Sequence, residues 1–383
     1  MKILLATPIY PPEIGGPATY IKELCERLHD QHDISVIAYT SIQNPLPKTT
    51  LFAISKYQPL PKRLLKFTLK LMKIAKGFDV VYVQNAMAAG LPVAIACTIL
   101  RVPFVLKFVG DEAWERATQN KLTEKKLEDF LQNPEGGLKI KMMMKIQGFV
   151  LRRAAVVTTP SAYLSEEIIK TYGVRKERTV VNYNASENSE IVPFEAQRVP
   201  HQIITTARLV VWKGVDGILR ALAILKKKIP DIKLIVAGDG PELENLQKLA
   251  QELNVSDDVV FKGNVSRAET WQLRKKSSVY VLNSTYEGLP HVVLTSFAAA
   301  IPIVATNISG TNEAVYHEDT GLLVNPGDDQ ALADALLRLF TDRKLSERLV
   351  QNGTKLLKTK FSWETHLSEL NKILKSVVPK PIN

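Results

Sequence analysis

The feature that most constrains the fold of this chain is an alternation of strand and helix patterns that occurs twice along 383 residues. In the first half, apolar runs rich in β-branched residues alternate with helical patterns; the runs are KILLATP, DISVIAY, DVVYVQ, PFVLKFVG and AAVVTTPS. The second half repeats the alternation with HQIITTA, DIKLIVAG, DVVFKG and SVYVLNS. Strands that alternate with helices indicate parallel, doubly wound sheets. The sequence therefore predicts an α/β protein with two Rossmann-like domains that face each other across a central cleft.

The expected domain bounds follow these two series. A first domain is predicted over 1–190, a second over 191–360 and a closing helical segment over 361–383 that returns toward the first domain. The segment 185–200 is polar and contains two prolines, which suits a linker. A chain of this length is more than one hydrophobic core usually serves, so two domains agree with its size.

Composition indicates a globular protein of a reducing compartment. The apolar fraction is 45% and the charged fraction 23%, which are ordinary values. Cys25 and Cys97 lie in apolar helical patterns without metal-ligand spacing, so both are predicted to be buried thiols. The apolar run 88–106 is interrupted by prolines and an arginine and is too broken for a membrane span. MKILLATPIY is too short for a signal-peptide core, and we expect a cytoplasmic protein.

The net charge of +11 indicates anionic partners. Nucleotide diphosphates and phospholipid head groups are both candidates. No nucleic-acid-binding fingerprint accompanies the charge, so no nucleic-acid partner is expected.

The strongest candidate for the chemistry is Glu287. It follows the predicted strand SVYVLNS and precedes the predicted helix HVVLTSFAAA, so it lies in the loop between them. In open α/β sheets, ligands bind beyond the carboxyl ends of the strands. A carboxylate in this loop can therefore meet a ligand, although an acid at a helix start can also simply complement the helix dipole.

Two other loops carry candidate phosphate-binding groups. Arg208 and Lys213 flank a loop between a strand and a helix, where two cations can neutralise a diphosphate, or where they can be an ordinary solvated pair. Gly15 and Gly16 follow the first strand and precede a helix, where backbone N–H groups can bind a phosphate. A tight turn explains these glycines equally well.

The stretch EGLP, the small-residue helix after it, PIVAT and NISGTNE together resemble the donor-site signature of the family-four (group 1) retaining glycosyltransferases, which have the GT-B fold. The resemblance implies that Glu287 lies near the transferred sugar. It places Thr295 where the family has a second glutamate that holds the ribose of the nucleotide. A hydroxyl cannot offer the two-oxygen grip of a carboxylate on adjacent hydroxyls. Glu313 is expected to hold the start of its own helix.

The resemblance extends over nearly the whole chain. It implies that Arg208 and Lys213 contact the donor diphosphate in place of a metal ion, so that no metal and no cofactor other than the nucleotide-sugar co-substrate are expected. It also implies front-face transfer with retention of configuration. The remaining residues that it assigns to nucleotide or sugar binding are Gly15, Gly16, Gly238, Val265, Gly288, Leu289 and Gly310.

A second departure from the family lies at the end of PFVLKFVGDEAW. Many family members have a histidine there, near the hydroxyls of the transferred sugar, and Val109 occupies the position. Asp111 follows two residues later. It is a candidate for a polar contact to sugar or acceptor, and equally a candidate cap for the next helix.

The segment 62–76, KRLLKFTLKLMKIAK, is predicted to be a basic amphipathic helix. Its six lysines and arginines fall on one helical face, and Leu64, Leu65, Phe67, Leu71, Met72 and Ile74 lie broadly opposite. One interpretation is a domain helix with lysines in water. The other is a helix whose basic face binds the anionic inner face of a membrane.

These observations favour a retaining glycosyltransferase that moves a sugar from a nucleotide-diphosphate sugar to a glycan or lipid-linked acceptor hydroxyl in cell-envelope biosynthesis. The alternative is a catalytically inactive GT-B scaffold or binding subunit, which Thr295 and Val109 motivate. A nicotinamide-dependent oxidoreductase ranks third, because the chain lacks the G-x-G-x-x-G fingerprint.

Overall fold

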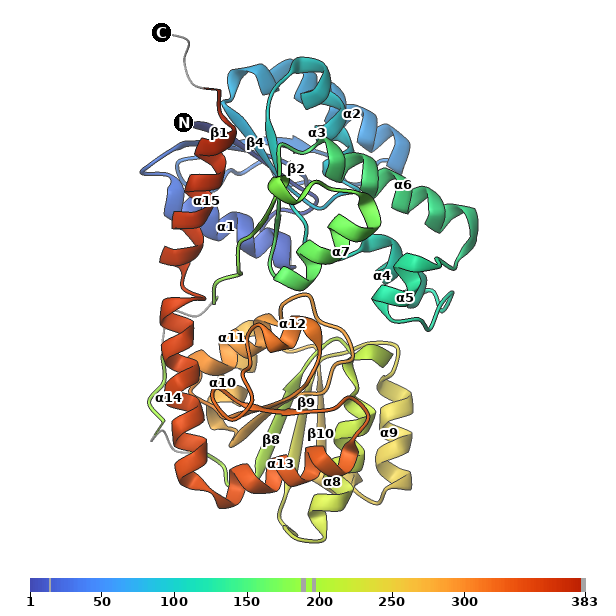
Figure 1. Ribbon diagram of the computed structural model, residues 1–383, viewed down its shortest axis with the longest axis vertical. Coiled ribbons are helices and arrows are strands. Elements are labelled where there is room, and N and C mark those ends of the chain that lie inside the picture. The colour runs from blue at the N-terminus through green and yellow to red at the C-terminus, as the bar shows by residue number, and fades with distance from the viewer. Residues whose placement is uncertain (14, 187–190, 195–197, 380–383) are drawn as a thin grey trace. The chain divides into compact units, whose positions relative to one another are not determined.

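The computed structural model describes residues 1–13, 15–186, 191–194 and 198–379, and its contacts divide the chain into two compact units. Unit 1 comprises Met1–Asn182 together with the chain from Ser368 onward, and unit 2 comprises Tyr183–Leu367. The last helix, α15 (Trp363–Val377), begins in unit 2 and ends in unit 1 (Figure 1). Part of the predicted linker, residues 187–190 and 195–197, lies outside the described residues.

Unit 1 contains a seven-stranded parallel sheet in the order β3-β2-β1-β4-β5-β6-β7. Its central strands are apolar except at their ends, because both faces of a parallel sheet are covered. The strands are β1 (Lys2–Thr7), β2 (Asp33–Tyr39), β3 (Thr50–Ile54), β4 (Val80–Gln84), β5 (Phe104–Lys107), β6 (Val156–Thr159) and β7 (Thr179–Val181).

The helices of unit 1 cover this sheet, and α2, α3 and α6 pack side by side (Figure 1). The helices are α1 (Gly16–Leu28), α2 (Leu60–Ile74), α3 (Gly90–Leu100), α4 (Glu112–Gln119), α5 (Leu127–Gln132), α6 (Gly137–Arg153) and α7 (Ala162–Tyr172), with short 3-10 turns η1 (Ala75–Gly77) and η2 (Lys176–Arg178). The carboxyl half of α15 joins them, since His32 contacts Asn371 through a 2.8 Å hydrogen bond.

Unit 2 contains a six-stranded parallel sheet in the order β10-β9-β8-β11-β12-β13. The strands are β8 (Gln202–Thr206), β9 (Lys233–Ala237), β10 (Val259–Gly263), β11 (Val279–Leu282), β12 (Ile303–Thr306) and β13 (Leu322–Val324). The helices are α8 (Val215–Lys226), α9 (Leu243–Glu252), α10 (Arg267–Lys276), α11 (His291–Ala298), α12 (Ser309–Asn312), α13 (Asp329–Thr341) and α14 (Arg343–Thr359), with 3-10 turns η3 (Val211–Lys213) and η4 (Ser256–Asp258).

The core of unit 2 has two layers, one on each side of its sheet. Successive strand residues belong to opposite layers, as Ile203 and Ile204 do on β8, because side chains alternate across a strand. One layer packs against α8, α9 and α13, and the other against α11 and the end of α14. The strand–helix alternation of the sequence is therefore confirmed in both units.

Each sheet has one point where its strand order reverses. In unit 1 the reversal lies between β1 and β4, and in unit 2 it lies between β8 and β11. The loops that leave two such strands run in opposite directions, and the crevice between them is where open α/β sheets bind ligands. The loops after β8 and β11 carry Arg208, Lys213 and Glu287, so these three residues lie at the switch point of unit 2.

Helix α2 differs from its predicted arrangement. Phe67 and Leu71 are its only fully buried side chains among the described residues, whereas Leu65 is 58% and Leu69 52% exposed. Arg63 packs over the ring of Tyr39, and Lys70 over the ring of Phe52. The predicted separation of basic and apolar faces is therefore confirmed in part. Four of the predicted basic residues are exposed, namely Lys62, Lys66, Lys73 and Lys76, and Phe67 and Leu71 are buried on the apolar side. Leu65 was predicted on the apolar side and is exposed, because a helix at the outside of the sheet buries only a narrow apolar line. Its exposed face combines leucines with Lys62, Lys66 and Lys73.

Within the described part of the chain, none of the helices combines the length and the apolar character that crossing a membrane requires.

Candidate functional site

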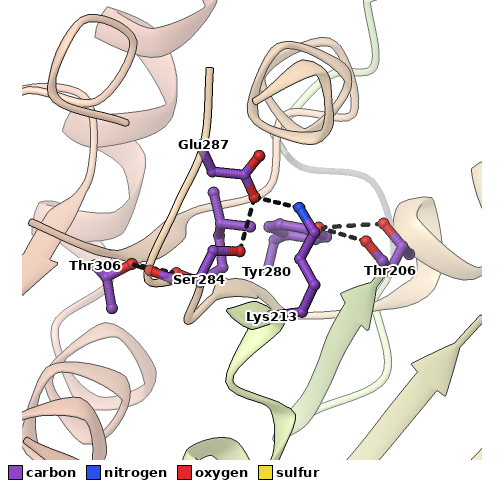
Figure 2. Close-up of polar contacts among 7 residues, drawn as sticks. Thr206, Lys213, Tyr280, Ser284, Glu287 and Thr306 are labelled. Carbon is purple, nitrogen blue, oxygen red and sulfur yellow. Dashed lines mark hydrogen bonds and ion pairs between the residues drawn. The ribbon is translucent and has the colours of Figure 1, made fainter. Parts of the chain in front are cut away.

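The loops after β8 and β11 meet at Lys213 and Glu287. The Lys213 Nζ lies 2.6 Å from the Glu287 Oε1, and the Ser284 hydroxyl donates to the same oxygen at 2.7 Å (Figure 2). Both charged side chains are mostly covered, at 21% and 12% exposure, so the pair interacts more strongly than a surface ion pair does. The structure thus brings together two residues that the sequence placed 74 positions apart.

Backbone contacts hold these two loops in register. The Thr285 N–H donates to the Trp212 carbonyl at 2.8 Å, and the Asn283 side chain donates to the Gly214 carbonyl at 2.8 Å. Gly214 has a φ of 60°, and a Cβ there would lie 2.1 Å from the Asn283 carbonyl oxygen. A larger residue would therefore separate the two loops, and glycine is required at this position.

Gly310 brings a third loop against the backbone of Glu287. A Cβ at position 310 would lie 1.9 Å from the Glu287 carbonyl oxygen, so only glycine permits this approach. The Thr306 hydroxyl donates to the carbonyl of Ser284 (Figure 2), which ties β12 to the same loop. The carbonyl of Gly288 is also part of the close approach of Gly310. The side chain of Leu289, by contrast, is buried in the apolar core. Leu289 can therefore face a ligand only through its backbone.

Arg208, Gly238 and Val265 line one open pocket of about 660 Å³, a size suited to a small ligand. A Cβ at Gly238 would lie 1.8 Å from the Ala207 carbonyl oxygen, and this glycine also has a φ of 147°. The close approach of the two loops forms the pocket floor. Asp239, Gly240, Asn264 and Thr270 complete the polar lining. Thr270 was not predicted, and its only sequence signal is its place one turn before Arg274.

Thr295 belongs to a hydrogen-bond network around the buried side chain of Arg274. Arg274 is 4% exposed and donates to the hydroxyls of Thr295 at 2.8 Å and Thr206 at 2.7 Å. Its guanidinium lies 5.0 Å from the ring centre of Tyr280, whose hydroxyl contacts Thr206 at 3.1 Å (Figure 2). The Thr295 hydroxyl also donates to the Val292 carbonyl at 3.0 Å. Protein groups therefore occupy the donor and one of the two acceptor positions of the Thr295 hydroxyl.

Gly15 and Gly16 lie in unit 1, where Gly15 ends the loop after β1 and Gly16 is the first residue of α1. Gly15 is the N-cap residue of α1, and no side chain caps that helix end. The loop is at the switch point of the unit 1 sheet, since β1 and β4 are neighbours there. These glycines therefore belong to a different unit from Arg208, Lys213 and Glu287.

Asp111 is a helix cap, and its assignment as a catalytic residue is corrected. Its carboxylate is 2% exposed and accepts hydrogen bonds from the Trp114 N–H at 2.8 Å, the Gln147 side chain at 3.2 Å and the Tyr172 hydroxyl. Burial raises the pKa of Asp111, although these hydrogen bonds act in the opposite direction. The carboxylate is therefore enclosed by protein groups of unit 1. Val109 is 51% exposed at the same strand end.

Lys107 was missed by the sequence analysis. It ends β5 beside Gln84 of β4, is 6% exposed, and places its ammonium 4.2 Å from the ring centre of Tyr20. Burial lowers the pKa of Lys107 to about 7. In the sequence this lysine occurs inside an apolar strand pattern, and a charge in a predicted core strand was the available signal.

Among the described residues, no group of three or more histidine, cysteine, aspartate or glutamate side chains is arranged to hold a metal ion.

Two family models match the chain in succession. A model described as Glycosyltransferase Family 4 matches residues 14–187, and a model described as Glycosyl transferases group 1 matches residues 189–356. The two matches meet close to the boundary between units 1 and 2.

Known relatives match the chain in part or over its whole length. A GDP-mannose-dependent α-(1-6)-phosphatidylinositol monomannoside mannosyltransferase of Mycobacterium tuberculosis is 31% identical over 180 residues. That match covers 45% of this chain and 47% of the relative, so the matched part spans about half of its length. The uncharacterized glycosyltransferase MJ1607 of Methanocaldococcus jannaschii is 25% identical over 406 residues and 98% of both chains.

Solved structures share the fold of the whole chain. HepE of Anabaena in complex with UDP has a TM-score of 0.75 at 22% identity, over 98% of this chain and 100% of its own. WaaG, a glycosyltransferase involved in lipopolysaccharide biosynthesis, has a TM-score of 0.70 at 15% identity, over 99% of this chain and 100% of its own. The expected GT-B fold of two parallel-sheet Rossmann-like domains is therefore confirmed.

Proposed function

Because the chain belongs to the group 1 glycosyl transferases of family four, we propose that it is a retaining enzyme that transfers a sugar from a nucleotide-diphosphate sugar to an acceptor hydroxyl. Unit 2 is the proposed donor-binding unit and unit 1 the acceptor-binding unit. The nucleotide sugar is a co-substrate, and the proposal includes no separate cofactor.

The observation that carries this proposal is the joined pair of loops at the switch point of unit 2. Lys213 and Arg208 belong to the loop after β8, and Glu287 belongs to the loop after β11. A diphosphate leaving group bound there would meet two cations, which perform the charge neutralisation that many transferases assign to a divalent ion. An inactive scaffold has no need for a carboxylate held by both Lys213 and Ser284.

In the proposed reaction, the bond between the sugar C1 and the diphosphate oxygen breaks, and a bond from the acceptor oxygen to C1 forms on the same face. The acceptor proton passes to the departing phosphate oxygen. Because the new bond forms on the face that the diphosphate leaves, the configuration at C1 is retained. Arg208 and Lys213 stabilise the charge that develops on the diphosphate. In this proposal Glu287 contacts the transferred sugar, and Gly310 permits its own loop to pack against the Glu287 carbonyl.

The relatives support the class of donor and acceptor. HepE was solved with UDP and with UDP-glucose, and the mycobacterial relative is named for GDP-mannose. Relatives from Rhizobium meliloti are named for lipopolysaccharide core biosynthesis, and the mycobacterial enzyme is named for a phosphatidylinositol glycolipid. We therefore place the acceptor of this chain among cell-envelope glycans and lipid-linked sugars.

The proposal is tested with a panel of UDP-, GDP- and ADP-sugars, by measuring slow donor hydrolysis and the binding of each nucleoside diphosphate. We expect at least one donor to be turned over, and Arg208→Ala to reduce this turnover by about 100-fold, because Arg208 lines the donor pocket. Lys248→Ala, an exposed lysine on α9, serves as the matched control. If no nucleotide or nucleotide sugar binds at millimolar concentration, the inactive scaffold is the correct function.

Thr295→Glu tests how the pocket recognises ribose. Arg274 lies 2.8 Å from the Thr295 hydroxyl, so an introduced carboxylate is expected to pair with Arg274 and not with ribose. We expect the Kd for the bound nucleoside diphosphate, measured by calorimetry, to change less than about threefold. Thr295→Gln has the same size without the charge and is the control. Tenfold tighter binding in Thr295→Glu alone would show that position 295 faces the ribose directly.

We further propose that unit 1 contacts the anionic inner face of a membrane in a cytoplasmic, peripheral protein. The exposed face of α2 carries Leu65 and Leu69 beside Lys62, Lys66 and Lys73, which is the residue combination of an interfacial helix. The three lysines contribute about 1 kcal/mol each near an anionic surface, and the leucines add apolar burial. Such binding is reversible and weakens as salt rises.

Sedimentation with vesicles tests the membrane proposal. We expect the protein to pellet with anionic vesicles at low salt and to remain in solution with neutral ones. Changing Lys62, Lys66 and Lys73 to Glu is expected to reduce pelleting strongly, whereas the same change at the exposed Lys248, Lys355 and Lys358 of unit 2 is not. Leu65→Ser with Leu69→Ser should weaken the salt-resistant part of the binding. Equal pelleting of both lysine variants would leave α2 as an ordinary solvated helix.

A further inference from the structure

Unit 1 contains a cavity of about 490 Å³ at the amino ends of β5 and β6, where Phe104 and Val156 begin these strands. Ligands of the proposed reaction belong at the carboxyl ends, so this cavity is at the opposite end of the same sheet. Its walls come from segments far apart in the sequence, namely the ends of α3, α6 and α15 and the turn η2. Its volume is that of a small-molecule site.

The charges that line this cavity are all positive. Arg153 is the last residue of α6, and Arg178 is the last residue of η2. No carboxylate is among the described residues that line the cavity. Within the described chain, neither guanidinium takes part in an ion pair within 4.0 Å. The Arg178 guanidinium donates to the Arg152 carbonyl at 3.5 Å. The Arg153 guanidinium lies 5.6 Å from the centre of the Phe149 ring. Two arginines beside one cavity form the donor set that recognises phosphate oxygens.

A third arginine strengthens the positive field without occupying the cavity. Arg152 donates to the Tyr172 carbonyl at 2.8 Å, which fixes its guanidinium against α7. Its charge therefore adds to the potential around Arg153 and Arg178, and an anion at this place would relieve the repulsion among the three.

The rest of the lining is apolar or carries a hydroxyl. Val102, Pro103 and Val377 supply apolar surface, and Thr98 and Ser376 supply hydroxyls. The Ser376 hydroxyl donates its proton to the Ile373 carbonyl at 2.7 Å. It can therefore accept a hydrogen bond from a ligand but has no proton left to donate to an anion. A ligand with one phosphate and a short organic body matches this division between two cations and an apolar wall.

We infer that the cavity between Arg153 and Arg178 binds a phosphate ester, with the phosphate on the two guanidinium groups and the organic part against Val102, Pro103 and Val377. The site is separate from the donor pocket, which lies in unit 2. The ester belongs either to a soluble phosphorylated compound or to a phospholipid head group. Ile99, the neighbour of Thr98 on α3, is 63% exposed and provides apolar surface on the same helix for the second source.

The test titrates the full-length protein with glycerol 3-phosphate by calorimetry, and separately sediments it with phosphatidylglycerol vesicles. Both are done in the presence of a saturating nucleoside diphosphate, which occupies any phosphate site of the donor pocket. We expect one of the two probes to bind and the double variant Arg153→Gln, Arg178→Gln to bind at least tenfold more weakly. Lys248→Gln with Lys355→Gln, both exposed in unit 2, is the charge-matched control.

The conservative pair Arg153→Lys, Arg178→Lys keeps the charge and is expected to retain part of the binding, which separates recognition from a folding defect. Binding of glycerol 3-phosphate identifies a soluble ester, and binding of vesicles alone identifies a lipid. For the vesicle arm, the Lys62, Lys66 and Lys73 variant provides the baseline, because its α2 no longer contributes. The inference is overturned if neither probe binds or if the glutamine pair binds as wild type does.

Discussion

Lys213→Ala is expected to lower kcat/KM for donor turnover by about 10²–10³-fold, the usual loss when one group that stabilises transition-state charge is removed. The lysine lies 2.6 Å from Glu287 and belongs to the loop that also carries Arg208. Its removal therefore weakens charge neutralisation on the diphosphate and also leaves the Glu287 carboxylate, which is 12% exposed, without its ion-pair partner.

Three variants separate these two effects. Lys213→Arg keeps the charge and should recover part of the rate, while Glu287→Gln with Lys213 intact reports the carboxylate alone. Lys248→Ala on α9 controls for the loss of an exposed lysine in the same unit. Turnover by Lys213→Ala within threefold of wild type would remove this residue from the proposed catalytic set.

Lys107→Met is expected to stabilise the protein, by up to about 4 kcal/mol at pH 6, because methionine fills similar space without a buried charge. Burial lowers the pKa of Lys107 from 10.5 to about 7 in the folded chain. Between pH 7 and 10.5 the unfolded chain binds the proton and the folded chain does not, so wild-type stability from this group rises with pH over that window. Below pH 7 both states are protonated and the full cost of the buried ammonium remains.

The measurement is urea unfolding of wild type and Lys107→Met at pH 6 and pH 9. The stability difference between the two proteins should be larger at pH 6, and Lys248→Met, at an exposed position, should show no such difference. A gain that is equal at both pH values would mean that Lys107 stays protonated in the folded chain throughout, so that its pKa is not lowered. Loss of donor turnover in a stabilised variant would show that the chain keeps this lysine for function.

The two sheets could be predicted because parallel strands covered on both faces are short, continuous apolar runs. The elements that were not predicted lack this signal. Strand β3 (Thr50–Ile54) is only partly buried at the edge of its sheet, and β13 (Leu322–Val324) is three residues long. The helices between 112 and 153 lie in a charged part of the sequence that is typical of a loop. Their helical periodicity becomes clear only once Trp114 and Phe130 are seen in the core.

The site could be predicted residue by residue but not as an arrangement. Arg208, Lys213 and Glu287 were each identified from their places at strand ends, whereas the contact between Lys213 and Glu287 depends on the order of strands, which the sequence does not state. Arg274 was missed because it occurs in the run LRKKSS, which is typical of a solvated surface. Its side chain is buried because Thr206 and Thr295 accept its hydrogen bonds.

The direction of the Asp111 side chain shows the same limit. The residues after a strand end indicated either a ligand contact or a helix cap with equal weight. Tyr172 and Gln147, 61 and 36 positions further along the chain, decide between them by donating to its carboxylate. The burial of side chains on α2 likewise depends on how little of that helix the sheet covers. A helical projection of the sequence carries no information about that coverage.

Unit 1 is built from two separate stretches of the chain. This determines the order in which the two units can complete their folding during synthesis. Unit 1 includes the chain from Ser368 onward, where Asn371 contacts His32, but all of unit 2 is made between these two parts. At about 5–20 residues per second, a ribosome would need roughly 10–40 s to pass from Asn182 to Ser368. The half that begins first is therefore the half that is finished last, and its sheet spends that interval without its closing helix.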